Sequence, residues 1–516
     1  MKAFLMYRDR DIDPAHELSA SEQALVQDLE LDTLWTAMAA GDDFLLGTAR
    51  QTVLRSLSSA EAITYRQDIL ADAIRQPDVV RQLYDLAVAA IVTERRAFFG
   101  LLSKSPDSVL YRSVQVLEMF TGRLKQLRAV ADEHAGSFES EGFTRLFRML
   151  AEELDDQYLQ TVEDHLKELG FRKGTLISAG LGQGNKGAGY LLRKLRDESW
   201  RDRLAIGGQP GFSFSVADRD QAGQQALSEL RSRGLNATAN ALAQSNDHIL
   251  VFFTMLRAEL AFYIGCLNLR ESLVGADEPV CVPVPLPEDK LGLTVRGLYD
   301  PALSLRLAGR AVGNDVEADG QRLVMITGAN QGGKSTFLRS VGVAQLMMQC
   351  GMFVAAESFT ASISAGVFTH FKREEDTTMV KGKLDEELSR MRDIADEISP
   401  GCLLLGNESF ASTNEQEGSE IARQIIRALL DSGIRVFFVT HLFDLAHSLY
   451  TGKGDSALFL RPERREDGQR TYQLLPGEPL STSYGPDLYW RIFGTPEPAS
   501  SPQAGEGGLA CGPQIT

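Results

Sequence analysis

A glycine-rich octapeptide at residues 328–335, GANQGGKS, contains the residue types that hold phosphate groups. It fits the pattern G-x-x-x-x-G-K-[ST], with the β-like run LVMIT before it and the helical sequence STFLRSVGVAQLMM after it. Glycines let the backbone curl so that successive N–H groups point at phosphate oxygens, and a helix N-terminus favours an anion. The segment therefore predicts a nucleotide-binding loop for ATP. Its residues are Gly328, Ala329, Asn330, Gln331, Gly332, Gly333, Lys334, Ser335 and Thr336.

A second run, CLLLGNES, begins at Cys402 and predicts a buried strand that ends beside this loop. Glu408 at its end is the candidate general base or water-orienting group. Asn407 stands where such sites usually carry Asp, so its amide oxygen accepts hydrogen bonds without adding negative charge. We expect this to weaken metal binding about tenfold and to slow hydrolysis. The predicted Mg²⁺ site comprises Ser335, Asn407 and Glu408. The alternative is an acidic strand end without a catalytic role.

A third run, IRVFFVTH, ends in His441. A histidine at a strand end beside the γ-phosphate can sense whether that phosphate is present. The competing interpretation is an ordinary surface histidine.

These segments belong to a chain of 516 residues, for which two or three domains are expected. Five scattered cysteines without a CxxC pair argue against a structural zinc site or a disulfide framework. The N-terminus does not resemble a signal peptide. In the apolar stretch HILVFFTMLRAELAFYIGCLNL, Arg257 and Glu259 lie at the middle, which favours a buried helix over a membrane span. We expect a cytoplasmic protein with no membrane contact.

Residues 1–275 have a helical pattern. Residues 240–273 contain no proline and predict a helix of roughly 50 Å, at ~1.5 Å per residue. Such a helix suits a lever that connects distant sites. One buried helical stripe is predicted from Phe143, Phe147, Leu150, Leu154, Tyr158, Val162 and Leu166.

Four closely spaced prolines at residues 276–290 predict a stiff linker between domains. Residues 291–495 then alternate helices with short apolar runs, which predicts a mostly parallel sheet. The runs are RLVMITG, MFVAA, CLLLG and RVFFVTH. Residues 496–516 are rich in Pro, Gly and Ser and predict a disordered tail.

The formal net charge of −17 argues weakly against a protein that depends on DNA affinity. Residues 171–234 depart from this average, with eleven Lys and Arg against six Asp and Glu among clustered glycines. This segment is either a solvated loop region or a nucleic-acid contact. The candidate DNA contacts are Lys186, Arg193, Lys194 and Arg196.

Together these motifs resemble the DNA mismatch repair MutS family. GANQGGKSTFLRSVG is similar to the family's GPNMGGKST segment, VGNDV to its PNDI-like segment, and VTHLFDL to its THxxEL. LLPGEPLSTSYG resembles its C-terminal signature, and LDTLWTAMAAGDDFLLGTARQTVLRSL resembles the start of its helical core. The similarity covers most of residues 28–493. It implies a multidomain α + α/β protein, in which a long-helix core and lever domain precedes an ABC-type P-loop α/β ATPase domain.

Several positions depart from the family pattern. The chain contains no Phe-x-Glu wedge of the kind that stacks on a mispaired base, so we expect no mismatch reading through that motif. The family's DEIGRGTSTYDG appears here as NESFASTNEQEG. Ala311 replaces the aromatic residue before the PND-like segment, so an adenine-stacking residue must come from elsewhere, and Tyr484 is one guess.

The resemblance assigns Lys334 and Ser335 to phosphate and Mg²⁺, Glu408 to water, and His441 to γ-phosphate sensing. It also implies a head-to-head homodimer, in which a loop of one subunit reaches the nucleotide of the other. That loop comprises Ser412, Thr413 and Asn414. Asn414 is equally suited to capping the helix that follows it. The basic segment at 171–234 would correspond to the family's clamp.

Two function classes remain. In the first, ATP closes the dimer, the levers move and a clamp opens or shuts on duplex or branched DNA. In the second, the same switch is an ATP-gated scaffold for protein partners that does not bind nucleic acid. The resemblance and the basic segment favour the first class, whereas the acidic charge and the missing wedge favour the second.

Overall fold

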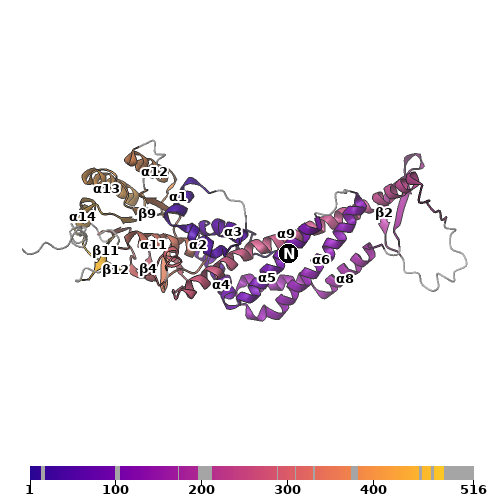
Figure 1. Ribbon diagram of the computed structural model, residues 1–516, viewed down its shortest axis with the longest axis horizontal. Helices are drawn as coiled ribbons and strands as arrows, with labels where there is room; N and C mark the ends of the chain where they lie inside the picture. Colours follow the sequence, from indigo (N-terminus) through magenta and orange to yellow (C-terminus); the bar gives the residue numbers. More distant parts are fainter. Residues whose placement is uncertain are drawn as a thin grey trace, which may run out of the picture.

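Helix α9, Gln221–Gly275, is the longest element of the protein and runs along much of its length (Figure 1). Its 55 residues correspond to about 80 Å at ~1.5 Å per residue. The computed structural model describes residues 1–12, 18–98, 105–171, 174–195, 212–287, 289–307, 309–328, 332–373, 382–452, 456–465 and 470–480. The helix predicted at 240–273 therefore exists, as part of a longer one.

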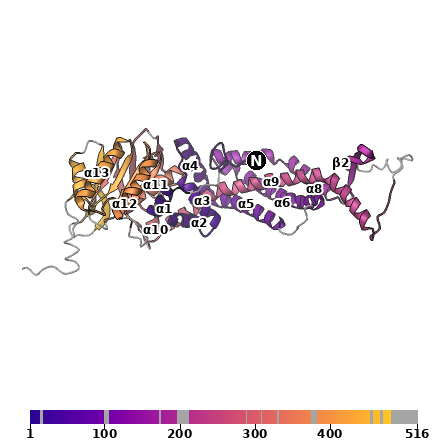
Figure 2. The same ribbon diagram turned by 90° about the horizontal axis from the view of Figure 1, so that it is seen from above.

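Eight helices precede α9 along the chain within these described residues. They are α1 (Ala20–Asp28), α2 (Leu31–Ala39), α3 (Asp43–Leu54), α4 (Ala60–Arg75), α5 (Pro77–Phe98), α6 (Pro106–His134), α7 (Glu141–Glu153) and α8 (Asp156–Leu169), with a 3-10 turn, η1, at Ala135–Ser137. Helices α5 and α6 pack along α9. We call α5 to α9, with the hairpin described next, the helical arm; Figures 1 and 2 show it extending away from the sheets.

A β-hairpin lies at the far end of the helical arm (Figure 2). Strands β1 (Leu176–Leu181) and β2 (Gly187–Arg193) pair antiparallel around a 3-10 turn, η2 (Gln183–Asn185). The sequence pattern did not predict these strands, because alternation of apolar residues is weak in a two-stranded sheet with one exposed face. The hairpin rests on α9, where Ile177 packs against Gly234.

The predicted helical stripe at residues 143–166 is wrong as a single helix. Helix α7 ends at Glu153 and α8 begins at Asp156, with Asp155 as its N-cap. The Asp155 side chain accepts a hydrogen bond from the backbone N–H of Tyr158, which starts a new helix instead of continuing the old one. Tyr158 is exposed, although the stripe placed it in the core.

The C-terminal part contains a six-stranded sheet with the order β12-β11-β6-β10-β9-β8. The strands are β6 (Leu323–Ile326), β8 (Val367–Phe371), β9 (Leu403–Asn407), β10 (Arg435–Val439), β11 (Ala457–Arg464) and β12 (Arg470–Pro476). All neighbours pair parallel except β11 with β12. The predicted mostly parallel sheet is therefore present, and three of the four predicted runs form strands β6, β9 and β10.

Helices cover both faces of this sheet. They are α11 (Lys334–Gln349), α12 (Lys383–Glu397), α13 (Glu415–Asp431) and α14 (Phe443–Thr451). Successive strand residues point to opposite faces, so Phe437 joins a core cluster with α11 and Phe438 one with α13 and α14. The cluster on the α11 side also includes side chains of α2, α5 and α9. One continuous hydrophobic core therefore joins the helices of the arm to the sheet.

A second sheet, absent from the sequence prediction, has four strands in the order β3-β7-β4-β5. They are β3 (Val284–Leu286), β4 (Leu293–Leu298), β5 (Asn314–Glu317) and β7 (Ser358–Ser362), and α10 (Pro301–Ser304) follows β4. The proline-rich segment is thus packed rather than a free spacer, since β3 lies within it. The run MFVAA forms only an isolated bridge between Val354 and Cys281.

The N-terminal segment is held inside the molecule by polar groups on α4 and α9. Glu259 is fully buried, and its Oε2 accepts a 2.5 Å hydrogen bond from the Leu5 N–H. Tyr263 donates to the Leu5 carbonyl at 2.5 Å. Burial raises the pKa of the Glu259 carboxyl to about 7.

Helix α9 is long and apolar enough to cross a membrane, but 67% of its most apolar window is buried inside the protein. Packing against α2, α3, α5 and α6 accounts for that composition. Arg257, at the middle of the stretch, lies over the Phe44 ring at 3.6 Å from its centroid.

Candidate nucleotide-binding site

The glycine-rich loop connects β6 to α11 at the carboxyl end of the parallel strands. Gly328 has φ +113° and Gly333 has φ +83°, a region that favours glycine. Gly333 is the N-cap of α11 and Lys334 its first residue. Because a glycine cap has no side chain, the first N–H groups of α11 are left for another acceptor. The loop positions Ala329, Asn330 and Gln331 lie outside the described residues.

The structure brings Ser335 and Asn407 together, as the sequence predicted. The Ser335 hydroxyl donates a 2.8 Å hydrogen bond to the Asn407 Oδ1. Ser335 lies in the first turn of α11, and Asn407 ends β9. These two oxygens are of the type that Mg²⁺ prefers. Within the described residues, no three His, Cys, Asp or Glu side chains gather as a metal cluster. Of the three predicted Mg²⁺ ligands, only Glu408 has an acidic side chain.

Glu408 and His441 face each other at the ends of neighbouring strands. The Glu408 Oε1 lies 3.9 Å from the His441 Nδ1, and both side chains are partly exposed. The Glu408 N–H donates to the Val439 carbonyl at 2.9 Å, which ties the end of β9 to β10. Glu408 also has φ +53°, so the chain turns sharply there. The carboxylate thus stands at the sheet edge beside the loop.

Lys334 is 4% exposed, and its Nζ donates a 2.7 Å hydrogen bond to the Gly328 carbonyl. Burial lowers the pKa of the Lys334 ammonium, whereas the nearby Glu408 carboxylate raises it and Arg470 lowers it further. Lys334, Glu408 and Arg470 therefore share one electrostatic environment.

Tyr472 on β12 is a functional candidate that sequence reasoning missed. A Cβ atom on Gly333 would lie 3.3 Å from the Tyr472 carbonyl, so the strand runs directly past the loop. The Tyr472 side chain is 49% exposed and the residue has φ +61°. Asn314 fixes this stretch: its Nδ2 donates to the Tyr472 carbonyl at 3.4 Å, and its Oδ1 accepts from Leu474 at 2.8 Å. Nothing in the sequence placed β12 against the loop. Tyr484 lies outside the described residues.

The candidate trans-subunit loop is engaged within its own subunit. Ser412 donates to the Glu387 Oε1 at 2.8 Å, and Thr413 donates to the Glu417 Oε2 at 2.7 Å. Asn414 is the N-cap of α13 and accepts from the Glu417 N–H. The capping role considered for Asn414 is therefore confirmed.

Three of the candidate DNA contacts are among the described residues, and they lie far from this site, in or next to the hairpin of the helical arm. Lys186 is exposed at the turn. Arg193 donates to the Ser178 hydroxyl at 2.9 Å, and Lys194 forms an ion pair with Glu168 at 2.5 Å. Arg196 lies outside the described residues. Two of the four cations therefore have partners within the chain.

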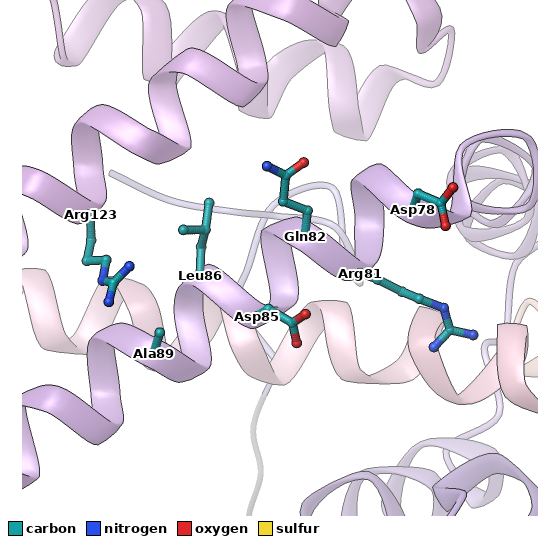
Figure 3. A pocket seen from close by; sticks show the side chains of 7 residues that line it. All are labelled: Asp78, Arg81, Gln82, Asp85, Leu86, Ala89 and Arg123. Atoms are coloured by element: carbon teal, nitrogen blue, oxygen red, sulfur yellow. The ribbon is translucent and has the colours of Figure 1, made fainter.

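A separate hollow on the helical arm gathers charged residues without forming a convergent site. Its lining consists of Asp78, Arg81, Gln82, Asp85, Leu86, Ala89 and Arg123 (Figure 3). Arg81 bonds Asn268 at 3.0 Å and Glu271 at 2.8 Å on α9, and the side chains in Figure 3 point in different directions. Arg81 thus links α5 to α9 at the edge of this hollow.

Comparison with known proteins agrees with this geometry. The family model for the MutS2 N-terminal domain matches residues 58–275, and that for MutS domain V matches residues 324–488. The DNA mismatch repair protein MutS of Synechococcus sp. (strain CC9605) is 27% identical over 70% of this chain and 40% of its own length. A MutS of Thermus thermophilus is 32% identical over 38% of this chain and 24% of its own. MutS protein homolog 4 of Mus musculus is 29% identical over 46% of this chain and 24% of its own.

The chain thus spans 40% or less of the length of these relatives. The two family models match separate parts, one along the helical arm and one across the parallel sheet with the glycine-rich loop. Both halves of the molecule, and the order in which they occur, correspond to the same family. The chain is a divergent member of the MutS family.

Proposed function

We propose that the protein is a Mg²⁺-dependent ATPase switch with an ABC-type nucleotide domain. The observation that carries this proposal is the hydrogen bond between Ser335 and Asn407 beside the curled loop. This hydrogen bond places the N-terminus of α11, the oxygens of Ser335 and Asn407, and the neighbouring Glu408 carboxylate at one edge of the sheet. The match to MutS domain V supports the same activity at the level of the family.

In this proposal, the loop amides and Lys334 bind the β- and γ-phosphates, and the lysine leaves the Gly328 carbonyl to do so. Ser335, Asn407 and Glu408 would hold Mg²⁺, which would neutralise charge on the phosphate oxygens. Glu408 orients the attacking water and accepts its proton, with His441 next to it as the γ-phosphate sensor. Because Asn407 is neutral, turnover is slow.

Tyr472 is the proposed platform for the adenine base. Ala311 offers no ring, whereas Tyr472 is half-exposed and its backbone and Cβ lie next to Gly333, the N-cap of α11. Aromatic stacking on a base contributes about 1–3 kcal/mol.

Contacts of α11 with α2 and α4, two helices that pack against α9 of the helical arm, support coupling between the nucleotide and the arm. Arg339, one turn into α11, forms ion pairs with Glu30 and Asp300. Arg66 on α4 is fully buried and donates to the Cys350 carbonyl at the end of α11, at 2.9 Å. Any tilt of α11 on closing over a nucleotide would therefore move α2 and α4. We propose that closure of a homodimer, with Ser412–Asn414 reaching the other subunit, moves the arms in this way.

Nucleotide binding can be tested by calorimetry with Mg·ATP on the full chain. We expect heat of association for the parent and about a tenfold or greater loss of affinity for Lys334→Ala, because one charge-assisted phosphate contact is removed. Lys125→Ala, an exposed lysine on α6, is the matched control and should bind like the parent. No heat at millimolar Mg·ATP would end the proposal.

The action on DNA is the second part of the proposal. The names of the relatives support it, and Lys186 is exposed at the tip of the hairpin. The alternative, an ATP-gated protein scaffold, is favoured by the internal partners of Arg193 and Lys194. Duplex and branched DNA titrated at several salt concentrations, with and without ATP, separate the two. DNA binding is supported if the affinity falls steeply with salt concentration and if this dependence is shallower for Lys186→Glu. No binding at low salt supports the scaffold.

A further inference from the structure

The turn that carries Glu408 is strained. Glu408 has φ +53° and Phe410 has φ +63°, two left-handed residues that flank Ser409. Side chains with a Cβ rarely adopt this conformation, and each instance costs on the order of 1–3 kcal/mol. Such a turn persists only where surrounding groups hold it.

Ser409 is where the turn is held. It is fully buried, and its hydroxyl lies 2.7 Å from the Nδ1 of His370 and 2.7 Å from the His370 carbonyl. The ring of Phe410 stacks on the His370 ring, with centroids 5.3 Å apart and planes 21° apart. His370 of strand β8 therefore holds both residues that follow Glu408: its ring contacts Ser409 and Phe410, and its backbone carbonyl accepts from the Ser409 hydroxyl.

His370 is itself oriented by α12. It is fully buried, and its Nε2 lies 3.0 Å from the Glu387 carbonyl. A carbonyl only accepts, so the Nε2 carries the proton and donates. The Nδ1 of the neutral ring is then an acceptor, and it shares the single proton of the Ser409 hydroxyl with the His370 carbonyl. Burial lowers the pKa of His370 to about 4, which keeps the ring neutral near pH 7.

Glu387 of α12 also contacts the loop that contains Ser412. Glu387 is 3% exposed, and its Oε1 accepts the 2.8 Å hydrogen bond from Ser412. His370 and Ser412 therefore attach to one residue, by its backbone and by its side chain. A shift of α12 would act on the turn of Glu408 and on the Ser412 loop together.

We propose that His370 is a positioning residue for ATP hydrolysis, which holds Ser409 and thereby aims the Glu408 carboxylate at the water-binding side of the nucleotide site. The inference rests on the proposed ATPase function. His370 touches neither nucleotide nor water; it acts through the turn.

Three substitutions separate positioning from packing. Ser409→Ala removes only the hydroxyl. His370→Gln keeps a polar group near the Nε2 position but loses the ring contact to Ser409, while the backbone carbonyl of residue 370 remains. Both should lower kcat about tenfold to a hundredfold, because a small misplacement of a catalytic group has effects of that size. Their affinity for Mg·ATP, measured by calorimetry, should stay within about twofold of the parent. His370→Asn keeps a polar group near the Nδ1 position and should retain most of the parent's kcat.

The double variant His370→Gln/Ser409→Ala should turn over no slower than the worse single variant, because both remove the same interaction. Ser113→Ala, a buried serine on α6, is the control and should behave like the parent. If Ser409→Ala lowers the melting temperature of the protein, Ser409→Cys replaces it, because cysteine has nearly the side-chain volume of serine. It should show the same loss of kcat.

Parent-like kcat in Ser409→Ala, or equal losses in His370→Asn and His370→Gln, would overturn the positioning role while leaving the ATPase intact. A parent protein that neither binds nor hydrolyses ATP would instead overturn the proposed function itself.

Discussion

The Ser335 hydroxyl donates to the amide oxygen of Asn407 at 2.8 Å, which joins the first turn of α11 to the end of β9. Helix α11 follows β6 along the chain, and β10 lies between β6 and β9 in the sheet. Neither side chain of this pair is charged, so in the proposed function the pair would offer Mg²⁺ two neutral oxygens. This makes residue 407 the most direct place to alter the strength of the site.

Asn407→Asp should tighten Mg·ATP binding about tenfold and raise turnover, because hydrogen bonds to ionised groups contribute roughly 1.5–3 kcal/mol against ~1 for neutral ones. The measurement is a Mg²⁺ titration at fixed ATP, followed by calorimetry and phosphate release. Asn246→Asp on α9 adds the same charge far from the site and should have no effect. An unchanged Mg²⁺ dependence would contradict the assignment of Asn407.

Glu408→Gln should lower turnover by a factor of about 10² or more while nucleotide affinity is retained, since the amide fills the same space but takes no proton. Single-turnover hydrolysis and equilibrium binding measured on the same preparation separate the two effects. Glu152→Gln, an exposed change on α7, serves as the control. Turnover like that of the parent would show that another group activates the water.

Tyr472→Ala should weaken ATP binding about tenfold, because it removes a stacking surface. Tyr472→Phe keeps the ring and should bind like the parent. Inorganic triphosphate lacks the base, so its affinity should be the same for all three proteins. Tyr158→Ala, another exposed tyrosine, provides the control. A loss of triphosphate affinity in Tyr472→Ala would indicate damage to the loop rather than lost stacking.

Glu259 should make the stability of the protein fall as pH rises through neutrality. Its pKa is about 7 when folded against a usual value of 4.5, so between these values the folded chain holds a proton that the unfolded chain releases. The stabilisation is complete below about pH 4.5 and is lost as pH rises through 7; its full size is about 3 kcal/mol. Glu259→Gln should flatten this dependence.

Denaturant unfolding of the parent and of Glu259→Gln at pH 5 to 8 measures the difference. Glu271→Gln, exposed on the same helix, should keep the slope of the parent. Parallel pH profiles for parent and Glu259→Gln would show that the buried carboxylate is not the titrating group.

Sequence alone determined the features that depend on local pattern. The glycine spacing at 328–335 predicted the loop, and the apolar runs that end at Asn407 and His441 predicted β9 and β10. Strand β9 ends at Asn407 as predicted, whereas β10 ends at Val439, two residues before His441. Composition and helical periodicity predicted the long helix. These features are local because backbone conformation and strand burial follow from a few neighbouring residues.

Tertiary structure decided which distant segments meet. Tyr472 lies beside Gly333, His370 grips Ser409, and Glu259 holds Leu5, although 139, 39 and 254 residues separate these pairs. The hairpin β1–β2 and the four-stranded sheet also depend on pairing partners that no short pattern specifies. Contacts of this kind arise when whole elements pack, so their physical cause is shape and burial across the fold rather than the order of residues along the chain.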